Sequence, residues 1–416
     1  MERIKPDIKR VRRDIIKSSE FVSSGELGYT RISFSKEDHE ARGYLTQLMT
    51  NEAKLSVRID VAGNLIGRRE GKKQKPAILV GSHIDTVRGG GRFDGISGVV
   101  AGIEVARKFE EEGIRTIHPL EVVVFLAEEP SPFAISTIGS RAMAGKLSED
   151  HLTSLKDGQG RTLGKAIDEM GGNSVKIGEA RRSPKEVLAF LELHIEQGPI
   201  LFSHGISIGV VTGIVGISRG EIEVVGRSDH SGTIPMESRK DALAAGAEVV
   251  LALEKICEEL DGVVGTIGKI EVFPNSLNVI PGKVIFGMEI RSLSDILLNQ
   301  TVSLFKKELD KIVKKRGTVI NFEVEVSSKP ILFNSKMVER IIGVCDHLGI
   351  SHLEIPSGAG HDASHLAEVA PTGMIFIPSR DGRSHCPEEW SEFEYICLGT
   401  EVLAHTIIEL DKEEPK

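Results

Sequence analysis

Five residues with metal-binding side chains occur at widely separated points of the chain, and most of them directly follow an apolar segment. Three are histidines and two are carboxylates, and in chain order they are His83, Asp94, Glu129, His194 and His385. Imidazole and carboxylate groups together bind zinc, manganese or cobalt, and a shared carboxylate can hold two such ions roughly 3.5–4 Å apart. The set predicts a two-metal hydrolase site. It leaves one adjacent carboxylate, Glu128, without a ligand role.

The apolar segments before these residues have the composition of buried β-strands. They cover residues 76–80, 120–127, 187–193 and 373–378. Parallel strands bring their carboxyl ends to one edge of a sheet, which is where α/β proteins bind their ligands. Apolar residues at helical spacing from Ile96 to Phe109 predict a helix that ends near Gly113. Asp94 is therefore expected at a turn from strand to helix.

The order of the predicted elements changes twice along the chain. Up to residue 212, strands alternate with helices, with polar, glycine-containing loops around residues 145–185, and this pattern indicates a mostly parallel α/β sheet. The next segment has the βαββαβ order of the ferredoxin-like motif, with strands at 221–225, 263–273, 283–291 and 318–326 and helices at 241–260 and 295–315. The first pattern then returns, with a helix near 335–348 and a closing helix from about 391. We expect a catalytic domain formed by residues 1–212 and 330–416, with a domain inserted at 213–329.

Composition excludes several classes of protein. A chain of 416 residues with 40% hydrophobic residues exceeds what one core normally holds, so two domains are expected. A net charge of -9, without any long basic run, argues against a nucleic acid partner. The charged N-terminal segment and the lack of an apolar stretch of roughly 20 residues predict a cytoplasmic protein without a membrane span. The four cysteines have no CxxC spacing, which argues against a disulfide framework.

The order and spacing of the motifs carry a specific resemblance. His83-x-Asp85, Gly-Gly-x-Phe-Asp94-Gly, Glu128-Glu129, His194-x-Glu-Gln-Gly and Ser-His385 resemble the superfamily of dinuclear metal amidohydrolases and peptidases, which includes aminoacylases, carboxypeptidases and dipeptidases. Three further segments resemble the branch of N-carbamoyl-L-amino acid hydrolase, β-ureidopropionase and allantoate amidohydrolase: His194-Ile-Glu-Gln197-Gly, Ser-Gly-Ala-Gly360-His361-Asp362-Ala and Asp229-His230-Ser-Gly-Thr. The similarity spans almost the whole chain.

The resemblance implies a role for each matched residue. It implies two divalent ions per subunit, zinc, manganese or cobalt, one held by His83, Asp94 and His194 and the other by Asp94, Glu129 and His385, with Asp94 as the bridge. Asp85 would orient the His83 ring. Glu128 would act as general base and then general acid. The substrate-binding residues would be Gln197, His230, Asn278, Arg291 and Gly360. His230 would stabilise the oxyanion from the partner subunit of a homodimer formed through the inserted lid domain.

The expected substrate is a small ureido carboxylate, and an N-carbamoyl-L-amino acid is favoured. Its hydrolysis would release ammonia and carbon dioxide. Arg291 and Asn278 would grip its carboxylate, and Gln197 would contact the ureido group. Allantoate hydrolysis and a related metallo-aminoacylase or peptidase activity are the alternatives within the superfamily. A carboxylate-binding module without catalysis would lack Glu128, and a nucleotide-binding protein would need more than the Gly89-Gly90-Gly91 run, which has no P-loop spacing.

Two features depart from the branch pattern beside the catalytic residues. Pro130 and Pro132 follow Glu129 where the branch has a glycine and a cationic side chain, and they are expected to stiffen that loop. Cys386 follows His385 where asparagine is usual. Histidines outside the ligand set, including His347, His352, His361 and His365, are interpreted as core or surface residues, although the loop of His361 and Asp362 is expected to line the pocket.

Overall fold

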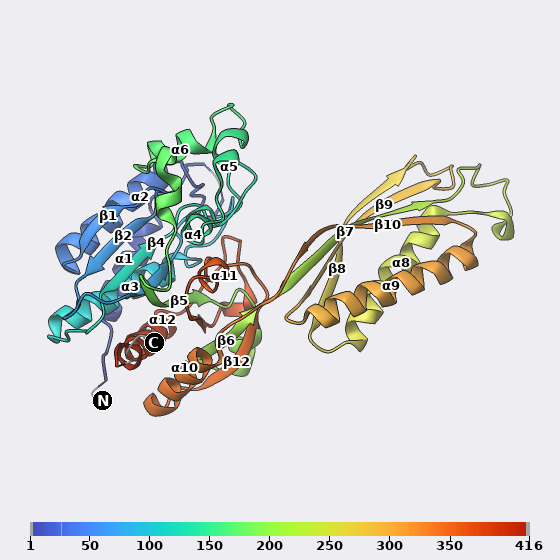
Figure 1. Cartoon of the computed structure of the whole chain (residues 1–416). Helices are drawn as coiled ribbons and strands as arrows, with labels where there is room; N and C mark the ends of the chain where they lie inside the picture. Colours follow the sequence, from blue (N-terminus) through green and yellow to red (C-terminus); the bar gives the residue numbers. More distant parts are fainter. Residues whose placement is uncertain (1–2, 26, 413–416) are drawn as a thin grey trace. The chain divides into compact units, whose positions relative to one another are not determined.

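The computed structural model describes residues 3–25 and 27–412. These residues divide into two compact units, one within Met1–Thr212 and Phe333–Lys416 and the other at Gly213–Leu332 (Figure 1). The first unit carries all five predicted metal ligands.

The first unit is built on a mixed sheet whose full strand order is β1-β2-β4-β3-β5-β13-β6-β11, in which β12 pairs with β6. The short edge strand β11 belongs to the segment of the second unit. Its central pairs, β4 with β3, β3 with β5, and β5 with β13, are parallel, and the pairs toward both edges are antiparallel. The strands are β1 (Ser56–Ile59), β2 (Leu65–Arg69), β3 (Ala77–Ser82), β4 (Leu120–Val124), β5 (Val187–Ile195), β6 (Ile208–Ile214), β11 (Ile331–Leu332), β12 (His352–Ser357) and β13 (Thr372–Ile377). The predicted α/β class with a largely parallel central sheet is confirmed.

The central strands are apolar because both of their faces are buried. β3, β4 and β13 are buried along their whole length. The helix α3 (Ile96–Glu111) packs on β3, β4 and β5, and α10 (Ser335–Leu348) and α12 (Phe393–Asp411) pack on β13. Two-sided burial makes strands read as continuous hydrophobic runs, which is why the sequence marked them. The remaining helices of this unit include α1 (Ile8–Ser18), α2 (Lys36–Gln47), α4 (Ile138–Met143), α7 (Ile200–His204) and α11 (Ala363–Leu366).

The segment around residues 145–185, predicted as loops, contains short helices instead. They are α5 (Glu149–Ser154), α6 (Leu163–Glu169) and the 3-10 helix η2 (Ser174–Ala180). Ser148 and Thr162 cap α5 and α6 through their side-chain oxygens. Leu152, Leu163 and Ile167 join a buried cluster with Phe133. One or two turns give too few apolar positions for a helical period to stand out in the sequence.

The second unit is a four-stranded antiparallel sheet with two helices. The strand order is β10-β7-β9-β8, and the elements are β7 (Gly216–Val225), α8 (Ala242–Glu259), β8 (Val263–Phe273), β9 (Lys283–Ser292), α9 (Asp295–Arg316) and β10 (Val319–Ser328). Its own core joins Phe286 and Ile290 of β9 to Val249 and Leu253 of α8 and to Phe305 of α9. None of the helices in the described part of the chain has the length and apolar character needed to cross a membrane.

Candidate active site

The five predicted ligands meet at the carboxyl ends of the central parallel strands. His83 directly follows β3, and His194 is the second-last residue of β5. Glu129 lies beyond β4 and His385 beyond β13, while Asp94 immediately precedes Gly95, the N-cap residue of α3. The edge of the parallel sheet therefore collects side chains that are more than 300 residues apart in sequence.

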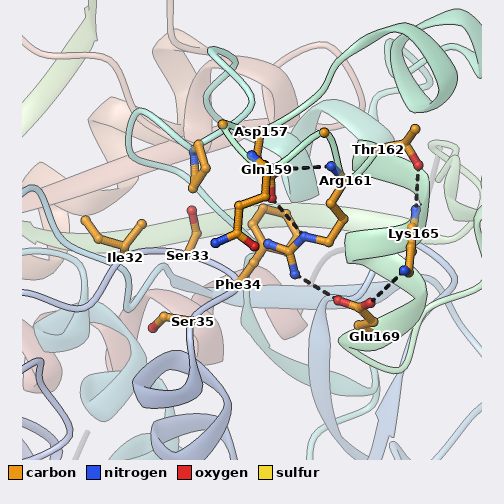
Figure 2. Close-up of a pocket in the computed structure, with 13 residues that line it drawn as sticks. Ile32, Ser33, Phe34, Ser35, Asp157, Gln159, Arg161, Thr162, Lys165 and Glu169 are labelled. Atoms are coloured by element: carbon orange, nitrogen blue, oxygen red, sulfur yellow. Dashed lines mark hydrogen bonds and ion pairs between the residues drawn. The ribbon is translucent and has the colours of Figure 1, made fainter.

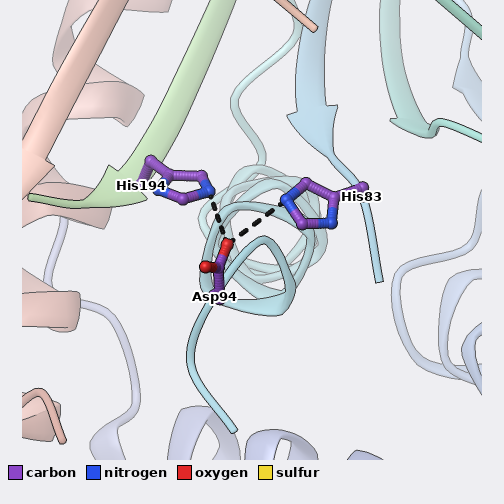
Figure 3. A group of neighbouring side chains, drawn as sticks. All are labelled: His83, Asp94 and His194. Atoms are coloured by element: carbon purple, nitrogen blue, oxygen red, sulfur yellow. Dashed lines mark ion pairs between the residues drawn. The ribbon is translucent and has the colours of Figure 1, made fainter. Parts of the chain in front are cut away.

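Asp94 is the centre of this cluster. Its Oδ1 lies 3.3 Å from Nε2 of His83 and 3.1 Å from Nε2 of His194 (Figure 3). Its Oδ2 lies 3.2 Å from Nε2 of His385, and that nitrogen is 3.4 Å from Oε1 of Glu129. The two oxygens of one carboxylate thus face two ligand sets. We call them the first ligand set (His83, Asp94 and His194) and the second ligand set (Asp94, Glu129 and His385).

The donor atoms of the first ligand set fit a bound cation. Nδ1 of His83 is 3.0 Å from the carbonyl oxygen of Asp85, and Nδ1 of His194 is 2.9 Å from that of Ile195. When each Nδ1–H donates to its carbonyl, each Nε2 lone pair is directed at the same Asp94 oxygen, and the lone pairs of these atoms repel one another. A cation bound between the three atoms would attract all of them. Atoms about 2.0–2.1 Å from a tetrahedral ion are about 3.3 Å apart, which matches the observed separations.

The charges around the cluster also favour cations. Burial would raise the pKa of Asp94, but His194 and the other two histidines outweigh it and hold that pKa well below its usual range. The hydrogen bond to Asp94 raises the pKa of His385 to about 9. Burial, and then the charge of Asp94, raises the pKa of Glu129 to about 7. Several carboxylates therefore compete for positive charge in a small buried volume, which divalent ions would supply.

Glu128 stands beside the ligands without belonging to either set. Its Oε2 is 3.8 Å from Nε2 of His83, and its side chain is almost fully buried. Burial raises the pKa of Glu128 well above its ordinary value, opposed by His83 and reinforced by Asp362 and Glu129. A buried carboxylate of raised basicity next to a metal centre has the properties of a general base.

Asp85 makes further contacts besides the one with His83 that the resemblance implied. Its carboxylate oxygens accept the backbone N–H groups of Glu128, at 3.2 Å, and Glu129, at 3.1 Å. Nδ1 of His83 is 3.6 Å from the Asp85 carboxylate but 3.0 Å from the Asp85 carbonyl. The carboxylate thus fixes the backbone of the Glu128-Glu129 pair, and the Asp85 carbonyl is the nearer of the two acceptors beside the imidazole.

Glu389 is a further residue of the site that the sequence did not reveal. Its Oε1 accepts the backbone N–H groups of Phe93, at 2.9 Å, and Asp94, at 3.1 Å. Its Oε2 accepts the Ser384 hydroxyl, at 2.7 Å, and the backbone N–H of His385, at 3.3 Å. One carboxylate therefore ties the loop of the bridging ligand to the loop of the last ligand. The signal available in sequence was a carboxylate four residues after His385, which is too common to single out.

Local backbone geometry at the site is specialised. Ala127, Gln197 and His385 have positive φ angles of 53°, 58° and 55°. Such angles are uncommon for residues other than glycine and gather where function holds the chain in place. Gly95 has a φ of +65°, and a Cβ there would lie 2.6 Å from the His83 ring. Only glycine lets the first turn of α3 approach that imidazole so closely.

Gln197 contacts the bridge of the cluster. Its Nε2 is 2.7 Å from Oδ2 of Asp94 and 3.2 Å from Nε2 of His385, and its buried Oε1 has no hydrogen-bond partner among the described residues. The residue lies two positions after the end of β5, the strand that supplies His194. An unsatisfied carbonyl at this point offers an acceptor to a ligand N–H group.

A second layer of buried polar groups lies behind the first ligand set. Glu192 accepts the Ser82 hydroxyl at 2.6 Å and the backbone N–H of Ala363 at 3.1 Å. The His361 ring packs edge to face on that of His194, with centroids 4.5 Å apart, and burial and then His194 lower its pKa well below the ordinary value. Glu192, His194 and the buried His361 form a third group with metal-binding atoms. Gly360 precedes His361 in an exposed loop with open space around its Cα.

The proline-containing loop after Glu129 borders a separate cleft. Phe133 packs edge to face on Phe34, with centroids 5.3 Å apart, and its ring lies 5.7 Å from the Arg161 guanidinium. Pro132 lines a cleft of about 890 Å³ between the segment at residues 32–35 and the segment at residues 157–169 (Figure 2). Arg161 and Lys165 are both directed toward Glu169 there. None of the five ligands lines this cleft.

The predicted substrate residues of the second unit lie at opposite ends of its sheet. Asn278 and His230 are together: the Ser231 N–H donates to the Asn278 carbonyl at 3.1 Å, and His230 forms a bridge with Val279. Arg291 lies eight residues along β9 from Lys283, where the Asn278 loop enters the strand, so about 27 Å of strand separates the two. The Arg291 guanidinium pairs with Glu289 at 2.6 Å. Arg291 and Asn278 of one chain therefore cannot bind the same small carboxylate.

Comparison with known proteins agrees with this geometry. Residues 79–409 match peptidase family M20/M25/M40. The chain belongs to this family. It is 39% identical to the N-carbamoyl-L-amino-acid amidohydrolase of Paenarthrobacter aurescens over 410 residues, which cover 98% of this chain and 99% of that protein. It is 33% identical to the allantoate amidohydrolase of Escherichia coli strain K12 over 395 residues, 94% of this chain and 95% of that one.

A crystal structure gives the same result for the fold. The hydantoinase/carbamoylase family amidase from Burkholderia multivorans superposes with a TM-score of 0.92 at 35% identity, over 99% of both chains. The resemblance predicted from the motifs is confirmed. Members of family M20 are metal-dependent enzymes, and the two ligand sets provide groups able to bind metal ions.

Proposed function

We propose that this member of family M20 hydrolyses the carbamoyl C–N bond of an N-carbamoyl-L-amino acid and releases ammonia and carbon dioxide. The chain is a hydrolase of C–N bonds other than peptide bonds, as its relatives are. The observation that carries the proposal is the arrangement of Asp94 between two ligand sets, with the buried carboxylate of Glu128 alongside. That arrangement separates metal binding from proton transfer.

The chain's own residues account for the proton transfers. Two divalent ions in the ligand sets, when bound, would supply an acidic water and a Lewis acid for the scissile carbonyl. Glu128 removes a proton from the attacking water and returns it to the leaving nitrogen. Asp85 holds the Glu128 backbone, so the base keeps its position during both steps. Gln197 directs its unpaired Oε1 to an N–H of the ureido group.

We further propose that Arg291 binds the substrate carboxylate, because a planar guanidinium can donate to both oxygens. His230 and Asn278 lie at the far end of the second unit's sheet, so they would serve the site of a partner subunit. A homodimer formed through the ferredoxin-like lid domain meets this requirement. The Oδ1 atom of Asn278 already accepts the Ser276 hydroxyl at 2.8 Å, which leaves the Asn278 amide N–H groups to donate to a carboxylate.

The dimer proposal is tested by mixing two inactive variants. One chain carries His230→Ala and the other carries Glu128→Ala, so a mixed dimer contains one site with both residues intact. We expect turnover to return as subunits exchange, toward a quarter of the wild-type rate for random pairing of equal amounts, since half of the dimers are mixed and each has one complete site. A mixture of the Glu128→Ala and Glu128→Gln chains is the matched control and stays inactive. If subunits exchange without any recovery, His230 does not serve a partner's site.

The substrate is tested with the metal-loaded protein by ammonia release from N-carbamoyl-L-amino acids, their amides and allantoate, and by release of the free amino acid from N-acetyl amino acids and dipeptides. N-carbamoyl-L-amino acids are expected to exceed allantoate, N-acetyl amino acids and dipeptides in kcat/KM, and the corresponding N-carbamoyl amino acid amides to be poor because they lack the carboxylate. The Glu128→Gln protein, prepared in parallel, measures contaminating activity. Allantoate as the best substrate assigns the chain to the allantoate branch. Dipeptides or N-acetyl amino acids as the best substrates overturn the proposal in favour of a peptidase or an aminoacylase.

A further inference from the structure

A concave basic site lies on the opposite edge of the first unit's sheet. Its cleft, of about 410 Å³, is lined by residues from β1, β2 and β4 and from the segments that lead into β3 and β5: Arg58, Arg68, Gln74, Lys75, Pro76, Glu121, Arg182, Lys185 and Glu186. Pro76 and Glu186 directly precede β3 and β5, so the cleft lies at the amino ends of these parallel strands. The ligand sets lie at their carboxyl ends, roughly 20 Å away along six residues of β3.

Three guanidinium groups converge in this cleft on one buried carboxylate. Oε1 of Glu121 is 3.2 Å from Nη2 of Arg58 and 3.0 Å from Nη1 of Arg68, and Oε2 is 3.0 Å from Nη2 of Arg182. The Glu121 side chain is 1% exposed. A single buried carboxylate needs about one guanidinium for compensation. The other two bring positive charge that Glu121 does not neutralise.

The remaining charges of the cleft do not remove the excess. Glu70 pairs with Arg68 at 2.7 Å from outside the cleft, and Glu186 accepts the backbone N–H and hydroxyl of Ser183. Lys75 and Lys185 line the cleft and make no ion pair with any described residue. The Nε–H of Arg182 is buried and finds no acceptor in the described part of the chain. The cleft thus holds excess positive charge and an unsatisfied donor in a protein whose net charge is -9.

We propose that this cleft is a binding site for a small multivalent oxyanion of the phosphate class, separate from the catalytic centre. Guanidinium groups donate pairs of parallel hydrogen bonds to phosphate oxygens, and the two lysines add charge from the rim. A bound oxyanion would satisfy the Arg182 donor and relieve the repulsion among the three guanidinium groups. The group could be free phosphate or the phosphoryl group of a small metabolite, because both present the same oxygens.

Calorimetric titration of the metal-loaded protein with inorganic phosphate tests the site, at constant ionic strength balanced with chloride. We expect saturable binding that the Lys75→Gln, Lys185→Gln double variant weakens by roughly tenfold or more, since two cations at the rim are lost. The matched control is the Lys36→Gln, Lys176→Gln double variant, which removes the same charge from exposed helical positions paired only with Glu40 and Glu179. The control is expected to bind phosphate as the wild type does.

Glycerol phosphate, titrated in a second arm, identifies the source of the anion. Tighter binding of glycerol phosphate than of phosphate assigns the cleft to a phosphorylated metabolite, and weaker binding assigns it to the free anion. The proposal is overturned if phosphate shows no saturable binding, or if the two double variants lose affinity equally. It is also overturned if binding survives the Lys75→Gln, Lys185→Gln change but disappears on chelation, because the anion would then occupy the metal centre.

Discussion

Replacing Glu389 should damage both the stability of the catalytic unit and its metal affinity, although this side chain belongs to neither ligand set. Its two carboxylate oxygens accept four hydrogen bonds, two from the loop of Asp94 and two from the loop of His385. Glu389 is 2% exposed, and the Phe93 and Asp94 N–H donors are also buried. In the Glu389→Ala variant these two N–H groups lose their acceptor while they remain buried away from water.

The magnitude follows from those two donors. An unsatisfied buried donor costs about 1–3 kcal/mol, so Glu389→Ala should lower the free energy of unfolding by about 2–6 kcal/mol. Glu389→Gln should cost less, because its amide oxygen still accepts from Phe93 and Asp94 while its NH₂ group meets the His385 N–H unfavourably. Loss of a group that orients metal ligands typically weakens metal affinity about 10–100-fold.

The assay compares denaturant unfolding of metal-depleted proteins and then metal affinity by competition with a chelator. Glu388→Ala is the matched control, because this neighbouring side chain is 57% exposed and pairs with Arg383 at the surface. It should change the free energy of unfolding by less than about 0.5 kcal/mol. Glu389→Ala with unfolding and metal affinity equal to those of Glu388→Ala would refute the role assigned to the carboxylate.

Three other predictions concern catalysis, metal and pH. Glu128→Gln should leave both ligand sets able to hold metal but lower kcat by about 10²–10⁴-fold, and near wild-type turnover with full metal content contradicts the assignment of the base. Chelation should abolish activity, and zinc, manganese or cobalt should each restore it because the ligand sets contain no thiolate; undiminished activity of a metal-depleted sample would count against this. Burial, followed by Arg141 and Lys146, lowers the pKa of His365 to about 3. Between pH of about 6.5 and about 3 the unfolded chain therefore binds a proton at His365 that the folded chain does not. As the pH is lowered through this range, the free energy of unfolding should decrease by up to about 1.4 kcal/mol per pH unit. Denaturation of His365→Gln across this range should show a smaller slope, and an equal slope contradicts the prediction.

The sequence by itself determined where the two ligand sets lie in the sheet. The strands that carry the ligands are buried on both faces, so each is a continuous apolar run followed by a polar residue, and both features are local. Parallel strands share one carboxyl edge whatever their order in the sheet. His83, Asp94 and His194 could therefore be placed together without knowing the strand order β4-β3-β5-β13. The elements of the second unit were local in the same way, because buried residues recur at every second position of β7 and β9, and both helices of this unit bury one apolar face.

The tertiary structure decided how residues outside those patterns pair. Glu389 accepts the N–H of a residue 295 positions away, and nothing near either residue in the chain indicates that contact. The register of β9 places Arg291 far from Asn278, so the carboxylate grip expected of these two residues cannot come from a single chain. The basic cleft gathers Arg58, Arg68 and Arg182 from three separate segments of a chain that has no long basic run. Ion pairs and hydrogen bonds between residues that are distant in the sequence depend on strand order and register. Strand order and register are properties of the folded sheet and not of local composition.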